Sequence, residues 1–418
     1  MLPLEKPWYR RLLLLTLVIG AAGGVLSLAF STVTGAGINF FFGNVGAGWW
    51  DGKWWWIPLM AIGGFTVSML RKIWKVPSKV PSPIKLAHDA WVDPGVAIPW
   101  AIISAVSLIF GAAMGPFFGF TVMGGGLGSW LVTRLGKDEE EEAKQQYALT
   151  GMAATMGAAF TSPFFAAILT SELSPTQKRS YVAAFIPALF AATVGYIIYF
   201  GVTGTTMLGS YALPPYEYKY AHLLIGALLG VLAAFILIVL ALIKKLVSAA
   251  FSLIPNSLVS GAIGGALVGL ITFALPLVAN SGSSQLGTII QNSALFGAAF
   301  LVAILIAKML ALSLSQATGF LGGFVFPLIF IGGTSGVLVN NIFPDIPIAL
   351  AVGCLLAAVA GAILNAPVAL ILIAAGTVLI APTALVPICI AVVTSHLSLA
   401  IVRYFVVGEE KLKVQQPD

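Results

Sequence analysis

Long apolar stretches separated by short polar segments run through most of the chain. They cover roughly residues 12–35, 55–70, 96–135, 148–171, 181–204, 221–243, 257–278, 295–314, 320–340 and 346–404. Several exceed the ~20 residues that one membrane crossing needs, so they must hold more than one helix or a broken helix. Because the runs are continuous and do not alternate with polar residues, they exclude a β-barrel. The pattern predicts an all-α integral membrane protein with ~14–18 helical pieces of unequal length.

Composition supports this interpretation and refines it. Hydrophobic residues make up 59% of the chain and charged residues 9%, with a mean hydropathy of +1.01. The 45 glycines and 23 prolines favour short, tilted and interrupted helices over a simple bundle. The basic head MLPLEKPWYRR precedes a long apolar run without a small-residue cleavage site, so we expect a retained first helix. Cys354 and Cys389 lie in apolar segments and predict buried thiols without a disulfide framework.

Basic residues gather in short clusters between the apolar runs and give a net charge of +6. The positive-inside rule makes these ends cytoplasmic, including both termini. The acidic segment KDEEEEAK, residues 137–144, is then expected on the other face or to be neutral for topology. We interpret the basic clusters as topology signals and expect no nucleic-acid partner, although a basic rim would also concentrate anions. The clusters are Lys6, Arg10 and Arg11; Arg71, Lys72, Lys75, Lys79 and Lys85; Lys178 and Arg179; Lys244 and Lys245; and Arg403, Lys411 and Lys413.

Two glycine-rich motifs recur 204 positions apart. GPFFGF at residues 115–120 is repeated as GFLGGF at 319–324, and GAAFTSP at 157–163 as GAILNAP at 361–367. A constant offset across two motifs predicts one unit used twice. In a membrane protein, paired Gly and Pro interruptions in two halves indicate a binding site, because broken helices expose free backbone N–H groups that bind anions.

Three segments carry helix-start chemistry ahead of an apolar run: PSPIKLAHD (81–89), GPFFGFT (115–121) and GGFVFP (322–327). The segment around Tyr404 is a fourth candidate. If the two halves face each other, these starts would direct N–H donors at one point. Chloride suits such a site, because backbone donors and the hydroxyl of Ser82 or Ser78 can replace its water without trapping it.

Groups for other chemistry are scarce. Of the 15 acids, only Glu172 lies at the edge of a clearly apolar run, and His88, His222 and His396 are better explained by packing than by a proton relay. No HExxH, CxxC, GxSxG or Walker motif occurs, and the run VMGGGLG follows an apolar segment rather than a strand. We therefore predict no enzyme, no cofactor and no metal site.

On these residues, the chain resembles the CLC chloride channel and transporter family in its short prokaryotic form without CBS domains. The resemblance covers about residues 10–400 and is most specific in segments 134–173, 322–333 and 357–376. The second segment is similar to the family's G-x-F-x-P filter motif, with Val325 at its Phe position. The resemblance implies two inverted-topology repeats, an anion pathway in each subunit and a homodimer. We place the first repeat at 12–205, the second at 215–405 and a short cytoplasmic tail at 406–418.

Departures from the family pattern matter as much as the match. The family's gating glutamate falls on Phe117 when GGGLG (124–128) anchors the alignment, or on Met114 when Gly115 anchors it. Its internal proton glutamate falls on Leu173, with Glu172 as the preceding acid. The serine motif is degraded, so Ser82 is its counterpart with Ser78 as a rival, and Tyr404 is the residue nearest to the pore tyrosine.

Three functions stay open at this point. The first is a passive chloride channel or uniporter in the plasma membrane, without proton coupling. The second is a chloride/proton antiporter using Glu172 or water chains, and the third is a non-conducting CLC-like subunit. The resemblance implies that the anion-binding residues are Ser82, Phe117, Phe118, Gly119, Gly323, Phe324, Val325, Phe326, Pro327 and Tyr404.

Overall fold

The computed structural model describes the chain except residues 1, 44–50, 78, 136–139, 158–159, 161, 175–180, 209–210, 212, 215, 379–382, 384 and 408–418. The described residues form sixteen α-helices and two short 3-10 turns and contain no named strand. Seven of these helices are long and apolar enough to cross a membrane. The all-α membrane architecture predicted from the apolar pattern is therefore confirmed, whereas the predicted tail at 406–418 lies mostly outside the described residues.

The first half of the chain forms eight helices of very different length. They are α1 (Pro7–Phe42), α2 (Trp56–Ile73), α3 (Pro83–Asp89), α4 (Pro94–Ile109), α5 (Phe117–Leu135), α6 (Glu141–Met156), α7 (Pro163–Leu173) and α8 (Tyr181–Thr203). Proline stands in the first turn of α1, α3, α4 and α7, where its missing N–H costs nothing. Side-chain oxygens of Ser82, Asp93 and Ser162 cap the last three of these starts.

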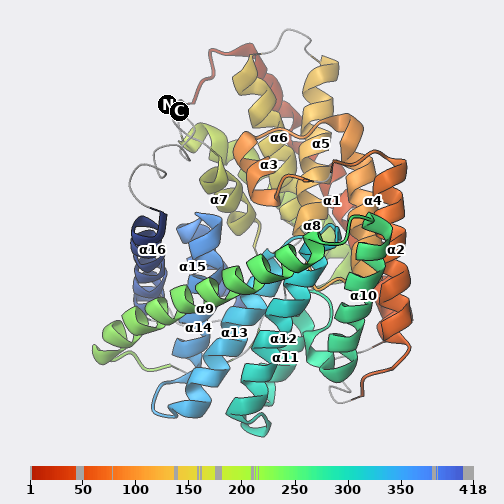
Figure 1. Cartoon of the computed structure of the whole chain (residues 1–418). Coiled ribbons are helices and arrows are strands. Elements are labelled where there is room, and N and C mark those ends of the chain that lie inside the picture. The colour runs from red at the N-terminus through yellow and green to blue at the C-terminus, as the bar shows by residue number, and fades with distance from the viewer. Residues whose placement is uncertain are drawn as a thin grey trace.

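The second half forms the other eight α-helices. They are α9 (Ala221–Ser252), α10 (Ser257–Ala274), α11 (Ser283–Gln291), α12 (Ala298–Ala317), α13 (Val325–Ile342), α14 (Ile348–Leu364), α15 (Pro367–Val378) and α16 (Leu385–Val407). The 3-10 turn η1 (Pro276–Val278) follows α10, and η2 (Ser293–Leu295) follows α11. In Figure 1, α9 crosses the front of the molecule at mid-height, with α3, α5 and α6 above it and α11, α12 and α13 below.

Glycines allow α5 and α6 to approach closely. A Cβ atom at Gly128 would lie 2.0 Å from the carbonyl oxygen of Tyr147, and one at Gly124 would lie 2.2 Å from the carbonyl oxygen of Gly151. Only glycine fits at such a backbone contact. The run VMGGGLG thus serves helix packing, as its apolar context predicts.

The described acids Glu140 and Glu142 lie beside the N-terminal segment of the chain. The Lys6 ammonium, just before α1, lies 2.6 Å from the Glu142 carboxylate and 3.0 Å from that of Glu140. These two hydrogen bonds, Glu142 foremost, raise the pKa of Lys6 above its ordinary value. Of the two expectations for this segment, the opposite face is wrong for the described residues Glu140 and Glu142, whereas the alternative, that the acids are neutral for topology, stays a prediction. Attraction between unlike charges overrides the charge separation that we had assumed.

Candidate anion site

The starts of α5 and α13 meet back to back. The Gly115 N–H donates to the Gly323 carbonyl at 2.7 Å, and the Gly323 N–H donates to the Gly115 carbonyl at the same distance. From this contact α5 runs toward the top of Figure 1 and α13 toward the bottom. The predicted proximity of the helix starts at Phe117 and at the GGFVFP segment is therefore realised through direct backbone bonding.

The register between the two halves differs from the one that the sequence offset predicts. α7 and α15 begin at Pro163 and Pro367, 204 positions apart, in agreement with the offset. α5 and α13, however, begin at Phe117 and Val325, 208 positions apart. Gly115 is thus the partner of Gly323 rather than the counterpart of Gly319. The matches between 115–120 and 319–324 are therefore four residues out of the structural register, in which Gly119 corresponds to Pro327, and the extra glycine at 319 produced the better sequence match.

Backbone donors are available at both helix starts. The first N–H groups of an α-helix have no acceptor within the helix. In α5 these belong to Phe117, Phe118 and Gly119, and in α13 to Val325 and Phe326, because Pro327 has none. No acceptor in the described part of the chain is recorded for these five groups. The helix dipoles add partial positive charge at the same place.

Aromatic side chains surround these donors. Phe117 is fully buried, and its Cβ would lie 2.5 Å from a Cβ added at Gly323. Phe118 is 2% exposed and stacks on Trp100 of α4, while Phe326 stacks on Phe160 at 6.5 Å between ring centroids. Phe117, one of the two positions predicted for the family's gating acid, is therefore apolar and closed to water. Among the described residues named here around the donors, none carries a carboxylate.

A cavity of about 590 Å³ leads from the surface to these helix starts. Ser82, Phe118 and Phe324 line it, and so does Met114, the alternative gating position. The Ser82 hydroxyl also accepts a hydrogen bond from the Lys85 N–H at 3.2 Å as the cap of α3. The structure thus brings Ser82 together with the two helix starts, whereas its rival Ser78 lies outside the described residues.

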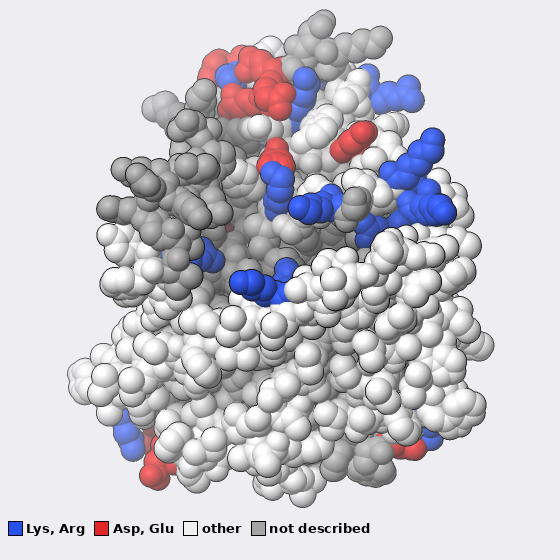
Figure 2. Space-filling view, viewed as in Figure 1, with Lys and Arg blue, Asp and Glu red and all other residues white. Residues whose placement is uncertain are grey.

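Basic residues line this cavity and a second one beside it. Arg71, Lys79 and Lys244 line the first cavity. The second, of about 570 Å³, is lined by Lys244, Lys245 and Arg403 and shares Lys244, Gln316 and Phe324 with the first. Among the described residues that line the two cavities, five are basic and none is acidic. We call the two cavities together the basic vestibule. Figure 2 shows Lys and Arg gathered around the hollow above α9.

From the sequence, these basic residues were interpreted as topology signals whose rim would also concentrate anions. Their role in lining a cavity could not be predicted, because they come from segments more than 300 residues apart. Gln316 was missed altogether. Such a vestibule raises the local concentration of anions.

Tyr404 is not brought to the site. It lies near the end of α16, is 48% exposed and is not among the residues that line the basic vestibule. Its ring contacts Phe405 edge-on. The neighbouring Val402 and Arg403 face the second cavity instead. Tyr404 was chosen because it is the tyrosine nearest in sequence to the family's pore position, and nearness in sequence does not determine which helix face a side chain occupies.

Glu172 closes a different helix start. Its carboxylate accepts hydrogen bonds from the N–H groups of Val368 at 3.1 Å and Ala369 at 2.8 Å, at the start of α15. This is a helix-end role, as expected for a boundary acid. Lys178 and Arg179, the basic residues that follow it in the sequence, lie outside the described residues. Leu173, where the resemblance predicts the family's internal proton glutamate, is buried.

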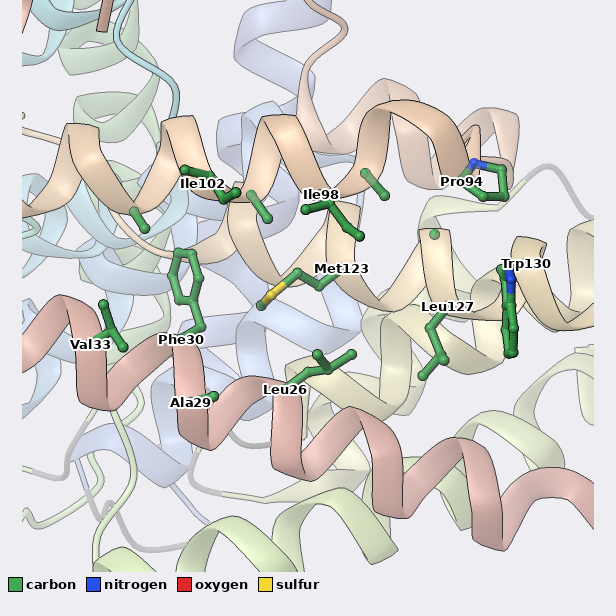
Figure 3. Close-up of a pocket in the computed structure, with 14 residues that line it drawn as sticks. Leu26, Ala29, Phe30, Val33, Pro94, Ile98, Ile102, Met123, Leu127 and Trp130 are labelled. Atoms are coloured by element: carbon green, nitrogen blue, oxygen red, sulfur yellow. The ribbon is translucent and has the colours of Figure 1, made fainter. Parts of the chain in front are cut away.

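A third cavity, a groove of about 520 Å³, lies between α1, α4 and α5 and is apolar along its length. Figure 3 shows Phe30, Met123 and Leu127 among the side chains that line it. Its lining holds no charged residue, so it does not suit a chloride ion. The groove nevertheless touches the candidate site, because a Cβ at Gly119 would lie 2.4 Å from the Phe30 ring.

Comparisons with known proteins agree with this arrangement. A profile described as "Voltage gated chloride channel" matches residues 63–399. A putative ion-transport protein, YfeO of Escherichia coli, is 24% identical over 361 residues, which cover 83% of this chain and 84% of YfeO. The uncharacterized protein MJ0305 of Methanocaldococcus jannaschii is 31% identical over 202 residues, so the alignment spans only about half the length of that relative.

Solved structures share the fold. A slow cyanobacterial Cl⁻/H⁺ antiporter superimposes with a TM-score of 0.81 at 18% identity, covering 97% of this chain and 99% of that one. A CLC-type fluoride/proton antiporter superimposes with a TM-score of 0.77 at 20% identity, covering 94% and 96%. At these identities the likeness concerns the fold. The family profile covers most of the chain and includes both meeting helix starts, so the protein belongs to the voltage-gated chloride channel (CLC) family of anion transport proteins.

Proposed function

We propose that this protein is a passive channel or uniporter for chloride or a similar small anion, without stoichiometric proton exchange. The observation that carries the proposal is the meeting of two helix starts with free N–H donors, α5 and α13, at the inner end of the basic vestibule. Such donors bind an anion without a full positive charge that would hold it.

The absence of proton coupling rests on two apolar positions. Phe117 stands where the family's gating glutamate is expected, and Leu173 where its internal proton glutamate is expected. Met114, the alternative gating position, is also apolar. Glu172, the remaining acid near the pathway, is committed to the start of α15 by two hydrogen bonds. Proton transport needs a titratable side chain within the membrane, and neither Phe117 nor Leu173 provides one.

The basic vestibule supports a proposal for how the protein is oriented in the membrane and in which membrane it lies. Its basic residues fit a cytoplasmic mouth in the plasma membrane, with both chain termini on that side. A homodimer with one pathway in each subunit, built from repeats at 12–205 and 215–405, completes the proposal. Cross-linking in native membranes tests the dimer.

An antiporter is the second candidate, favoured by the fold shared with two proton-coupled antiporters. A non-conducting subunit is the third, favoured by the buried rings of Phe117, Phe118 and Phe326 at the helix starts. Chloride efflux from reconstituted vesicles, with the internal pH recorded at the same time, separates the three. We expect chloride efflux without proton movement. Proton uptake that scales with chloride efflux supports the antiporter, and efflux equal to that of empty vesicles supports the non-conducting subunit.

A further inference from the structure

Among the described residues, one lysine is fully buried inside the helix bundle. Lys308 lies in the middle of α12 and has no exposed surface. Its Nζ atom donates to the carbonyl oxygens of Val278 at 2.9 Å and Asn280 at 2.6 Å. It also lies 5.0 Å from the centre of the Phe330 ring. Two carbonyl oxygens and an aromatic face are the surroundings that favour an ammonium over a neutral amine.

No acid stands near this lysine in the described elements that pack against α12. These elements are α9, α10, α13 and η1. Of them, only α9 carries titratable side chains, and these are His222, Lys244 and Lys245. No ion pair is recorded for Lys308 among the described residues. A cation in a low-dielectric interior without a counter-charge is costly, and such residues are commonly functional.

Lys308 is connected to the start of α13 through Phe330, whose ring centre lies 5.0 Å from its Nζ atom. Phe330 lies five residues after Val325, which is about 8 Å along the helix axis. Taken together, these lengths put the ammonium on the order of 10–15 Å from the first N–H groups of α13. The basic vestibule also touches α12, at Leu312 and Gln316, which lie between Lys308 and the carboxyl end of the helix. Water screens the vestibule cations, whereas Lys308 is shielded from water.

We propose that Lys308 is a buried positive charge that strengthens anion binding at the starts of α5 and α13, and that the bound anion is its counter-ion. This inference rests on the proposed function of those helix starts. Two unit charges about 12 Å apart, at an effective dielectric constant of ~20, attract each other enough to change the affinity about tenfold.

Asn280 offers a way to cancel the charge without removing the amine. Its side-chain Oδ1 is buried and has no hydrogen-bond partner, while its backbone carbonyl binds the Lys308 Nζ. Asn280 also adopts a left-handed φ of 51°, which aspartate tolerates nearly as well as asparagine. Asn280→Asp would place a carboxylate beside the ammonium and leave both carbonyl hydrogen bonds available.

The test measures chloride affinity by calorimetry on the purified full chain, with chloride as the probe, and chloride efflux from vesicles. Lys308→Met and Asn280→Asp are each expected to weaken chloride binding about tenfold. Leu305→Met is the matched control, because Leu305 is a buried neutral residue one turn away on the same helix. It is expected to stay within twofold of the wild type.

The outcomes separate charge from structure. Unchanged affinity in folded Lys308→Met overturns the inference. If Lys308→Met does not fold, Asn280→Asp decides, because a purely structural lysine keeps its hydrogen bonds in that variant and the affinity then stays at the wild-type value. A wild-type chain that neither binds nor releases chloride overturns the proposed function itself, whereas a wild type that binds chloride while both variants match it overturns only the role of Lys308.

Discussion

Two pairs of helix starts lie at corresponding places in the two halves, and they are used in opposite ways. α5 and α13 join through the Gly115–Gly323 hydrogen bonds and leave their own first N–H groups free. α7 and α15 have theirs covered: the Ser162 hydroxyl accepts from Phe164 at the start of α7, and the Glu172 carboxylate accepts twice at the start of α15. The same backbone chemistry thus leaves N–H donors free for the proposed anion site where no side chain caps the helix, and forms a structural joint where one does.

The largest expected effect is a gain of pH dependence when the uncapped pair receives an acid. In Phe117→Glu, the new carboxylate competes with chloride for the N–H groups of α5 and α13. Because protonation removes that competition, chloride efflux should be several-fold lower at neutral pH than at acidic pH. Efflux from vesicles over this pH range measures the effect.

Phe117→Ala and Met114→Glu are the companion variants. Phe117→Ala should raise chloride efflux if the buried ring blocks the anion path. It should change efflux little if the ring lies outside that path. If Phe117→Glu behaves as the wild type at every pH, residue 117 does not face the anion. Met114→Glu then tests the alternative position.

The joint between α5 and α13 should tolerate no side chain. An alanine Cβ at Gly323 would lie 2.5 Å from the Phe117 Cβ, so the variant Gly323→Ala should destabilise the protein by about 1–3 kcal/mol. The apparent melting temperature in detergent, followed by size-exclusion chromatography, should fall by several degrees. Gly201→Ala is the matched control, because a Cβ there meets nothing within 4 Å. Equal melting temperatures for the two variants would show that the close approach is not needed.

Removing the charge from the capped start of α15 should have a moderate effect. Glu172→Gln keeps an acceptor but loses the attraction between a carboxylate and a helix dipole, at a cost of about 1–2 kcal/mol. We expect a lower melting temperature. Chloride efflux and the accompanying change in internal pH should stay as in the wild type. If Glu172→Gln abolishes proton movement and spares chloride efflux, the protein is an antiporter that uses this acid.

The neutral cap of α7 should matter least. Ser162→Ala removes one acceptor at 3.3 Å from the Phe164 N–H, and losing such a cap costs about 1 kcal/mol. The fall in melting temperature should therefore be smaller than for Glu172→Gln. If the melting temperature falls further in Ser162→Ala than in Glu172→Gln, the neutral cap of α7 contributes more stability than the charged cap of α15, contrary to our expectation.

The apolar pattern predicted the fold class well, because every helix that crosses a membrane needs a long apolar sequence. It predicted less of the site. The glycine motifs placed both helix starts correctly, but their exact pairing depends on one hydrogen-bonded pair, Gly115 with Gly323, that repeated glycines leave ambiguous. Tyr404 was misplaced, because local sequence does not determine which way a side chain points. The ion pair between Lys6 and Glu142 was also not predicted, because its partners lie 136 residues apart in the chain. Lys308 was overlooked, although a lysine inside the apolar run 295–314 was a visible signal.

The two backbone hydrogen bonds between Gly115 and Gly323 also limit how fast and by what motion an anion path could open. Pulling the helix starts apart would leave four polar groups unpaired in an apolar interior, which costs several kcal/mol. Rotation of the rings of Phe117, Phe118 or Phe326 needs no such loss. Passage at this point would then depend on side-chain rotation rather than on separation of the two helix starts. Because the three rings are buried in a close-packed interior, each rotation requires neighbouring side chains to move, so the rate of anion flow should rise steeply with temperature.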